Sequence, residues 1–115
     1  MENQHRQIKG YRDLSAQEID LMNRIKAAGQ ALIDLQAEVA GRLRTDYELK
    51  HGSAKLSLTS AERAENINVQ SSASPECQEF RRFEAAEPGR WAAIAKTDIQ
   101  TGVMALVRAI AQPAV

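Results

Sequence analysis

The strongest periodic pattern in the sequence lies in residues 14–43, which read LSAQEIDLMNRIKAAGQALIDLQAEVAGRL. Apolar residues recur there at alternating intervals of four and three, a spacing that places them along one line of an α-helix and that no alternating strand produces. We name this line the first stripe; its members are Leu21, Ile25, Ala28, Leu32, Leu35 and Val39. The pattern predicts one long helix, and we expect the first stripe to pack against the rest of the chain.

A capping-box pattern marks the beginning of this helix. The Ser15 hydroxyl can accept from the amide of Glu18, while the Glu18 carboxylate accepts from the amide of Ser15. Leu14, just before the cap, is predicted to pack against Ile19. The helix is therefore expected to begin directly after Ser15.

A second stripe runs beside the first and consists of Met22, Lys26, Gly29 and Ile33. It is unusual because it places a cation between apolar neighbours and includes a glycine, which costs about 1 kcal/mol relative to alanine inside a helix. Lys26 can lie along its apolar neighbours and direct its ammonium to a ligand, with Gly29 leaving room for a phosphate; alternatively, the ammonium extends to water. The second stripe is thus a candidate ligand-binding surface.

The composition favours a single, mainly α-helical domain. The 115 residues are 43% hydrophobic but only 4% aromatic, which suits packed helices better than a sheet. Basic and acidic residues number 15 each, so the chain lacks the overall positive charge typical of non-specific DNA or RNA binding. The chain has a single cysteine, Cys77, so no internal disulfide is expected. The sequence shows no signal-peptide pattern, and it lacks the apolar run of about 18 residues that a membrane span requires. These features indicate a soluble cytosolic protein.

A second clear helix is predicted in residues 90–113, RWAAIAKTDIQTGVMALVRAIAQP. Its apolar stripe comprises Trp91, Ala95, Ile99, Gly102, Val103, Leu106 and Ile110, with Pro113 marking the end. Many small residues allow another backbone to approach closely, so we expect this helix to pack on the first as an antiparallel hairpin.

Residues 45–86, between the two helices, are predicted to form a loop-rich insertion. Gly52 and Ser53, after the end of the first helix, are expected to interrupt any helix there, and short helices are expected at residues 60–65 and 76–86 around a loop.

A hairpin that buries one stripe on each helix leaves other apolar residues uncovered, and two helices alone are marginally stable. The apolar residues that lie off the first stripe and off the stripe of the last helix are Met22, Ile33, Ile94 and Val107. We therefore expect a homo-oligomer, with a dimer of hairpins as its unit.

Catalysis and metal binding are not indicated. The two histidines, His5 and His51, have no cysteine or carboxylate at a ligand spacing, and the sequence contains no nucleophile motif and no glycine-rich phosphate loop. No cofactor is expected.

Two groups of residues are candidates for binding an anionic ligand. In the expected N-terminal arm, residues 1–13, Tyr11 lies beside Arg12 and could stack on a base or pack on the first helical turn. Near the start of the last helix, Arg90 and Thr97 share a face two turns apart, with Lys96 beside them. Such a group suits a phosphate, although a solvated first turn explains it equally well.

Two blocks of the sequence, KGYRDLSAQEIDLMNRIKAAG and RWAAIAKTDIQTGVMALVRAIAQP, resemble the phage anti-CBASS cyclic-nucleotide sponge proteins, which share a helical-hairpin domain with some anti-Thoeris sponges. The resemblance implies a non-enzymatic homohexamer in the cytoplasm of an infected bacterium. Such a protein binds cyclic di- and trinucleotide second messengers without cleaving them, and so prevents activation of the host defence. DNA, RNA and membranes are not expected as partners.

The resemblance also implies roles for individual residues. Tyr11 resembles an aromatic residue that stacks on a base of a cyclic dinucleotide, and Lys26 a cation that meets its phosphate. Arg90 and Thr97, with Lys96, are the nearest candidates for a separate cyclic-trinucleotide site. The alternative is a helical oligomeric adaptor or assembly protein without a nucleotide ligand, in which Lys26 only extends to water.

Overall fold

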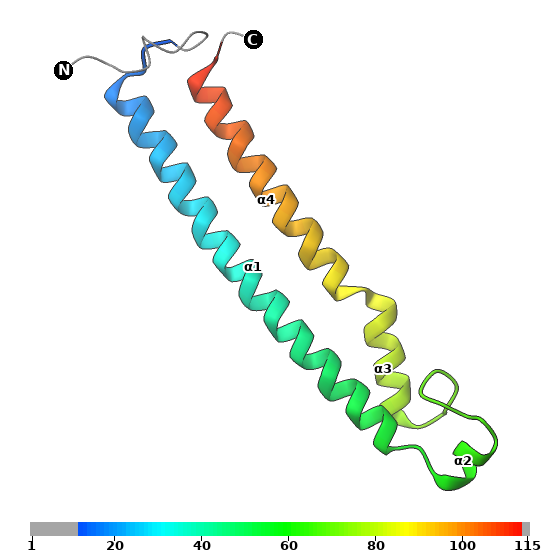
Figure 1. Cartoon of the computed structure of the whole chain (residues 1–115). Helices are drawn as coiled ribbons and strands as arrows, with labels where there is room; N and C mark the ends of the chain where they lie inside the picture. Colours follow the sequence, from blue (N-terminus) through cyan, green and yellow to red (C-terminus); the bar gives the residue numbers. More distant parts are fainter. Residues whose placement is uncertain (1–11, 114–115) are drawn as a thin grey trace. The chain divides into compact units, whose positions relative to one another are not determined.

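The computed structural model of this chain describes residues 12–113, and within them the regular structure is entirely helical (Figure 1). The helices are α1 (Ala16–Leu56), α2 (Ser60–Ala64), α3 (Pro75–Ala86) and α4 (Pro88–Ala111). The predicted mainly α class is confirmed.

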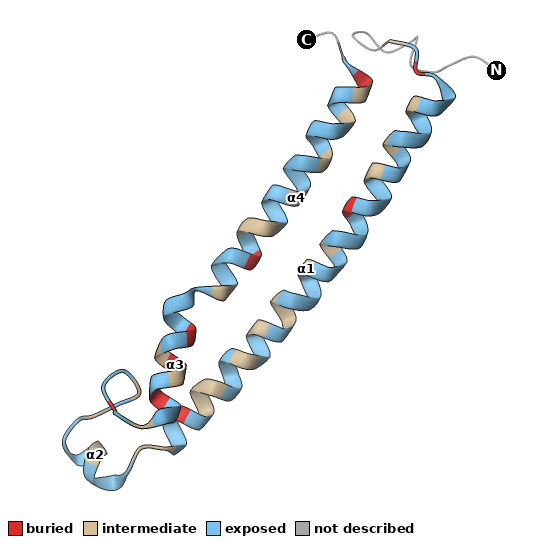
Figure 2. Cartoon of the chain, turned by 180° about the vertical axis from the view of Figure 1, so that it is seen from behind, coloured by how far each residue is buried: buried red, intermediate tan, exposed pale blue. Residues whose placement is uncertain are grey.

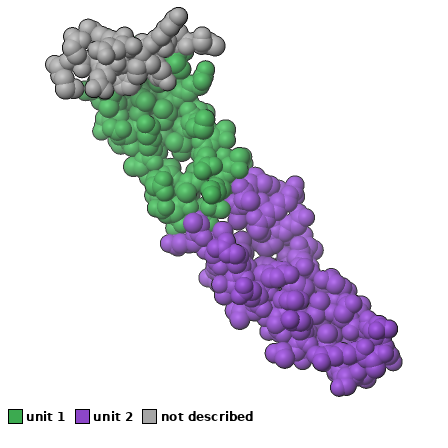
Figure 3. Space-filling view, viewed as in Figure 1, with its two compact units in different colours: residues 1–36, 95–115 green, residues 37–94 purple. Residues whose placement is uncertain are grey.

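Two compact units share these helices, as the colours of Figure 3 show. The first unit contains residues 1–36 and 95–115, and the second contains residues 37–94. Both α1 and α4 contribute to each unit. In the first unit the two helices lie side by side and run in opposite directions (Figures 1 and 2). That the chain forms a single domain stays a prediction.

The start of α1 follows the predicted capping box. The Ser15 hydroxyl accepts from the Glu18 amide at 3.1 Å, and the Glu18 carboxylate accepts from the Ser15 amide at 2.9 Å. Leu14 is buried, whereas Ile19 is 39% exposed. The first helix therefore begins where the sequence predicts.

The face of α1 that packs against α4 in the first unit is the second stripe, so the expectation for the first stripe is wrong. Gly29 is buried, and a Cβ atom built on it would overlap the Cγ2 methyl of Val103 on α4. By contrast, Leu32 is 49% exposed and Leu35 is 56% exposed. The missing side chain of Gly29 lets the helices approach, and that fit outweighs the greater hydrophobicity of the first stripe.

The stripe on α4 is only partly as predicted. Ile99, Val103 and Ile110 are half-buried, but Trp91 and Leu106 are exposed. The residues expected to be left for a second copy, which are Met22, Ile33, Ile94 and Val107, are all half-buried within the chain. The apolar surface that remains exposed therefore belongs to the first stripe, not to these residues.

Residues 45–86 are largely helical, so the predicted loop-rich insertion is wrong. Helix α1 continues through Gly52 and Ser53 to Leu56, and only residues 57–59 and 65–74 lie outside helices. One glycine costs about 1 kcal/mol in a helix, and the packing of Ala54 two residues later offsets that cost.

A small core holds the second unit together. Ala54 of α1 packs with Cys77 and Phe80 of α3, and Leu58 and Val69 cover them. Phe80 and Phe83, three residues apart on α3, are both buried.

Local sequence signals set the remaining boundaries. Thr59 and Glu62 form a capping box at the start of α2, in the region where a short helix was predicted. Glu87 takes a left-handed conformation, with φ 50° and ψ 49°, between α3 and α4. In the described part of the chain, no helix combines the length and apolar character needed to span a membrane.

Candidate functional site

Lys26 lies on α1 at the edge of the helix contact in the first unit. Its side chain is exposed, although Met22 and Gly29 on the same stripe are covered. Within residues 12–113 its ammonium makes no ion pair, so it is accessible to an anion. The space beside Gly29 is filled by Val103, however, and the expectation that this glycine leaves room for a phosphate is wrong.

Tyr11 lies outside the described residues, but Arg12, the next residue, is well defined. Its guanidinium donates to the Glu18 carboxylate at 2.5 Å and to the carbonyl oxygen of Ile110 at 2.6 Å. The hydrogen bond from Arg12, with a second from the Ser15 amide, lowers the pKa of Glu18 to about 2. Arg12 is thus bound within the chain.

Arg90, Lys96 and Thr97 are all exposed on α4. Arg90 forms an ion pair with Glu87 at 3.0 Å, and its guanidinium lies 5.5 Å from the centroid of the Trp91 ring. Arg90 therefore already has partners in the second unit. That it joins Lys96 and Thr97 in one site stays a prediction.

A groove of about 460 Å³ follows the first turns of α1 in the first unit. In the described part of the chain it is lined by Ala16, Gln17, Asp20, Leu21 and Arg24. Arg24 forms a weak ion pair with Asp20 at 3.6 Å, and both side chains are mostly exposed. This groove supplies a second accessible cation near the start of α1, which the sequence analysis missed because a pair four residues apart on a helix is ordinarily solvated.

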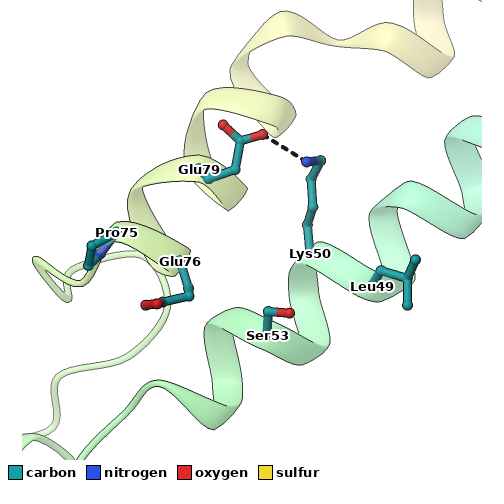
Figure 4. A pocket seen from close by; sticks show the side chains of 6 residues that line it. All are labelled: Leu49, Lys50, Ser53, Pro75, Glu76 and Glu79. Atoms are coloured by element: carbon teal, nitrogen blue, oxygen red, sulfur yellow. Dashed lines mark ion pairs between the residues drawn. The ribbon is translucent and has the colours of Figure 1, made fainter.

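Another groove, of about 360 Å³, lies between α1 and α3 in the second unit (Figure 4). Across it Lys50 pairs with Glu79 at 2.8 Å. Hydrogen bonds from Arg82 and then from Lys50 lower the pKa of Glu79 to about 2. Lys50 and Glu79 are therefore already paired within the chain, which argues for a structural role of this pair.

Metal chemistry has no support from the described residues, where no cluster of three or more His, Cys, Asp or Glu side chains could hold an ion. His51 instead belongs to an aromatic group. Its ring centroid lies 5.8 Å from that of Tyr47 and 4.9 Å from that of Phe80.

Comparison with known proteins identifies the family. A sequence model described as the Acb2/Tad1 hairpin domain matches residues 3–111. The chain belongs to the Acb2/Tad1 hairpin-domain family. It is 63% identical over 113 residues to "Anti-CBASS protein 2" of Pseudomonas phage JBD67, and the alignment covers 98% of this chain and 97% of that relative. The resemblance to the phage anti-CBASS proteins is therefore confirmed.

The extent of this alignment also bears on residues 45–86. Because nearly the whole of both chains is aligned, the relative has no room to lack a segment of that length. The segment lies inside the match to the Acb2/Tad1 hairpin domain as well. It is a shared part of the hairpin rather than an insertion in this chain.

Proposed function

We propose that this chain is a phage protein that acts against CBASS by sequestering cyclic oligonucleotide second messengers, without cleaving them, in the cytoplasm of the infected bacterium. The observation that carries the proposal is the 63% identity, over almost the full length, to a phage protein named for anti-CBASS activity. Sequestration requires binding groups only, so the function needs neither a cofactor nor an acid–base pair.

For a cyclic dinucleotide, the proposed binding residues are Tyr11 and Lys26. The exposed ammonium of Lys26 supports this role, because a charge-assisted hydrogen bond to a phosphate is among the stronger polar interactions available to a side chain. Tyr11 supplies an aromatic face for a base. Arg90, Lys96 and Thr97, all exposed on α4, are proposed for a separate cyclic-trinucleotide site.

A homo-oligomer, proposed as a hexamer, is supported by the exposed first stripe. Leu21 is 44% exposed, Leu32 49%, Leu35 56% and Val39 52%. Intervals of three and four are the spacing by which helices pack as coiled coils, so this face suits a helix of another copy. A preformed assembly also loses little conformational entropy when it binds a ligand, which favours tight binding.

The test is to incubate the purified protein with a panel of cyclic di- and trinucleotides, measure the affinities, and then denature the complex and identify what is released. Intact nucleotide after tight binding supports sequestration, whereas altered nucleotide indicates an enzyme. No binding across the panel contradicts the proposal and favours an adaptor whose exposed first stripe binds another protein.

Single substitutions then locate the site. Tyr11→Ala and Lys26→Ala should each weaken cyclic-dinucleotide binding about tenfold or more, the scale of one charge-assisted contact, and leave the oligomer assembled. The matched control is Lys55→Ala, which removes another exposed cation from α1 and should leave the affinity unchanged. Normal binding by both test variants would place the site elsewhere.

A further inference from the structure

Two charged residues continue the exposed apolar line of α1 within the second unit. Beyond Val39 the alternating intervals of the first stripe lead to Arg42, Asp46 and Leu49, which lie three, four and three residues further on. All four residues belong to α1 in the second unit, and we call them the 39–49 face. Val39 is 52% exposed, Leu49 is 65% exposed, Arg42 is exposed and Asp46 is half-buried. The face therefore offers two apolar side chains on either side of two opposite charges.

These two charges satisfy each other only weakly. Nε of Arg42 lies 3.8 Å from the carboxylate of Asp46, one turn further along the same helix. An ion pair of this kind on a helix surface contributes little to stability. An arginine carries five N–H donors, and a carboxylate can accept several hydrogen bonds. Both groups thus keep most of their capacity for a partner from outside the chain.

The order of the charges makes the face complementary to itself. When two copies meet across a two-fold axis, each contact occurs twice with its two residues exchanged. An antiparallel pair of α1 helices that sets Arg42 of one copy opposite Asp46 of the other also sets Val39 opposite Leu49, because both pairs are centred on position 44. A parallel pair in register would instead set each charge against the same charge of the other copy, which is unfavourable. Charge complementarity therefore favours the antiparallel direction.

We infer that the 39–49 face binds the same face of a second copy in the antiparallel direction, with Arg42 and Asp46 forming ion pairs between the copies. A polar residue within an apolar line of this spacing fixes the register of paired helices at some cost in stability. Here Val39 and Leu49 supply the apolar contact, and the charges select its direction. The inference rests on the homo-oligomer proposed above but not on nucleotide binding.

Complementary charge variants test the contact between copies. Arg42→Asp leaves two acidic groups on the face and Asp46→Arg leaves two basic groups, so each variant alone sets like charges against each other. The dissociation constant of the assembly, measured by sedimentation, should rise about tenfold or more for each variant alone. An equal mixture should recover assembly, and native mass spectrometry should show complexes that contain both variants. Neither variant keeps the ion pair within its own helix, so recovery can come only from a contact between copies.

Arg24 and Asp20 provide the matched control, because they form an ion pair of the same spacing on α1, at 3.6 Å, but are not members of this line. Arg24→Asp and Asp20→Arg should each assemble like the unsubstituted chain. Circular dichroism of every variant shows whether its helix content is preserved.

Disulfide cross-linking tests the direction independently of the charges. Bridged cysteines have Cα atoms within about 7 Å of each other, whereas positions 39 and 49 are about 15 Å apart along a helix. A mixture of Val39→Cys and Leu49→Cys should therefore form linked heterodimers under mild oxidation, and neither variant should link to itself. Cys77 is buried, so the unsubstituted chain should stay unlinked under the same oxidant.

The outcomes separate the inference from the proposal on which it rests. Self-linking of either cysteine variant, an unlinked mixture, or a charge mixture that assembles no better than its components overturns the antiparallel contact while the unsubstituted chain remains an oligomer. A monomeric unsubstituted chain overturns the proposed homo-oligomer, and the antiparallel contact with it. Nucleotide binding by that monomer would still support sequestration.

Discussion

Replacing Gly29 with alanine tests which face of α1 closes the hairpin. Alanine gains about 0.5–1 kcal/mol over glycine inside a helix. At this position, however, the new Cβ would overlap Cγ2 of Val103, with Cβ and Cγ1 of Val103 both 3.6 Å away. Overpacking of this kind costs about 1–3 kcal/mol, so we expect a net loss of about 1 kcal/mol in the free energy of unfolding.

Gly52→Ala provides the matched control, because Gly52 also lies inside α1 but has no neighbouring atom within 4 Å of an added Cβ. It should gain the full helix-propensity benefit of about 0.5–1 kcal/mol. The measurement is urea unfolding followed by circular dichroism at several protein concentrations, since assembly also contributes to stability. The difference between the two variants, about 2 kcal/mol, isolates the contact of Gly29 with α4.

Val103→Ala in the Gly29→Ala background completes the test. It removes the Cγ2 methyl group that the new Cβ would overlap, so the double variant should lose less stability than the two single losses added together. If Gly29→Ala is instead as stable as Gly52→Ala, the second stripe does not face α4. The first stripe would then close the hairpin, as the sequence analysis expected.

The remaining predictions concern acid stability and assembly. Glu18 and Glu79 both have pKa values of about 2, below the ordinary 4.5, so their contribution is complete above about pH 5 and is lost as the pH falls from 4.5 towards 2. An acid titration followed by circular dichroism should show this loss, and Glu79→Gln should make it shallower; an unchanged curve would contradict the ion-pair assignment. Leu35→Glu should dissociate the oligomer in sedimentation while preserving helix content, whereas the same change at Leu56, which is 86% exposed and outside the first stripe, should not.

Features that depend on neighbours within a few residues could be predicted from the sequence. The two capping boxes each join residues three positions apart, and the end of α3 follows from the adjacent Pro88. Phe80 and Phe83 share a face because the helical repeat fixes it. Such interactions join residues close together in the sequence, so they can be predicted from the sequence alone.

The choice of the packed face could not be predicted in this way. Hydrophobicity favoured the first stripe, but Leu32 is exposed and Gly29 lies directly against Val103 of α4. Gly29 allows a close contact between helices, whereas Gly52 lies inside a helix without such a contact. The two glycines differ only in their tertiary neighbours.

The same limit applied to the candidate site. The exposure of Lys26 follows from its charge. Arg12, by contrast, donates a hydrogen bond to the carbonyl of Ile110, which lies 98 residues away in the sequence. No local pattern distinguishes a cation held at the far end of a hairpin from one that awaits a ligand. In the sequence, a basic residue beside an aromatic one is compatible both with a hydrogen bond within the hairpin and with binding of a ligand.

The second stripe of α1 packs against α4, and the first stripe is exposed. Assembly through the first stripe can therefore be independent of ligand binding at Lys26. Lys26 and Leu35 are nine residues apart, and at about 100° per residue they lie on roughly opposite sides of α1. A second copy that covers the first stripe at Leu35 therefore leaves the Lys26 ammonium accessible. Substitutions should accordingly affect assembly and nucleotide binding separately. Lys26→Ala should lose nucleotide affinity while the oligomer stays intact. A Lys26→Ala variant that also dissociates would show that assembly and nucleotide binding share one face of α1.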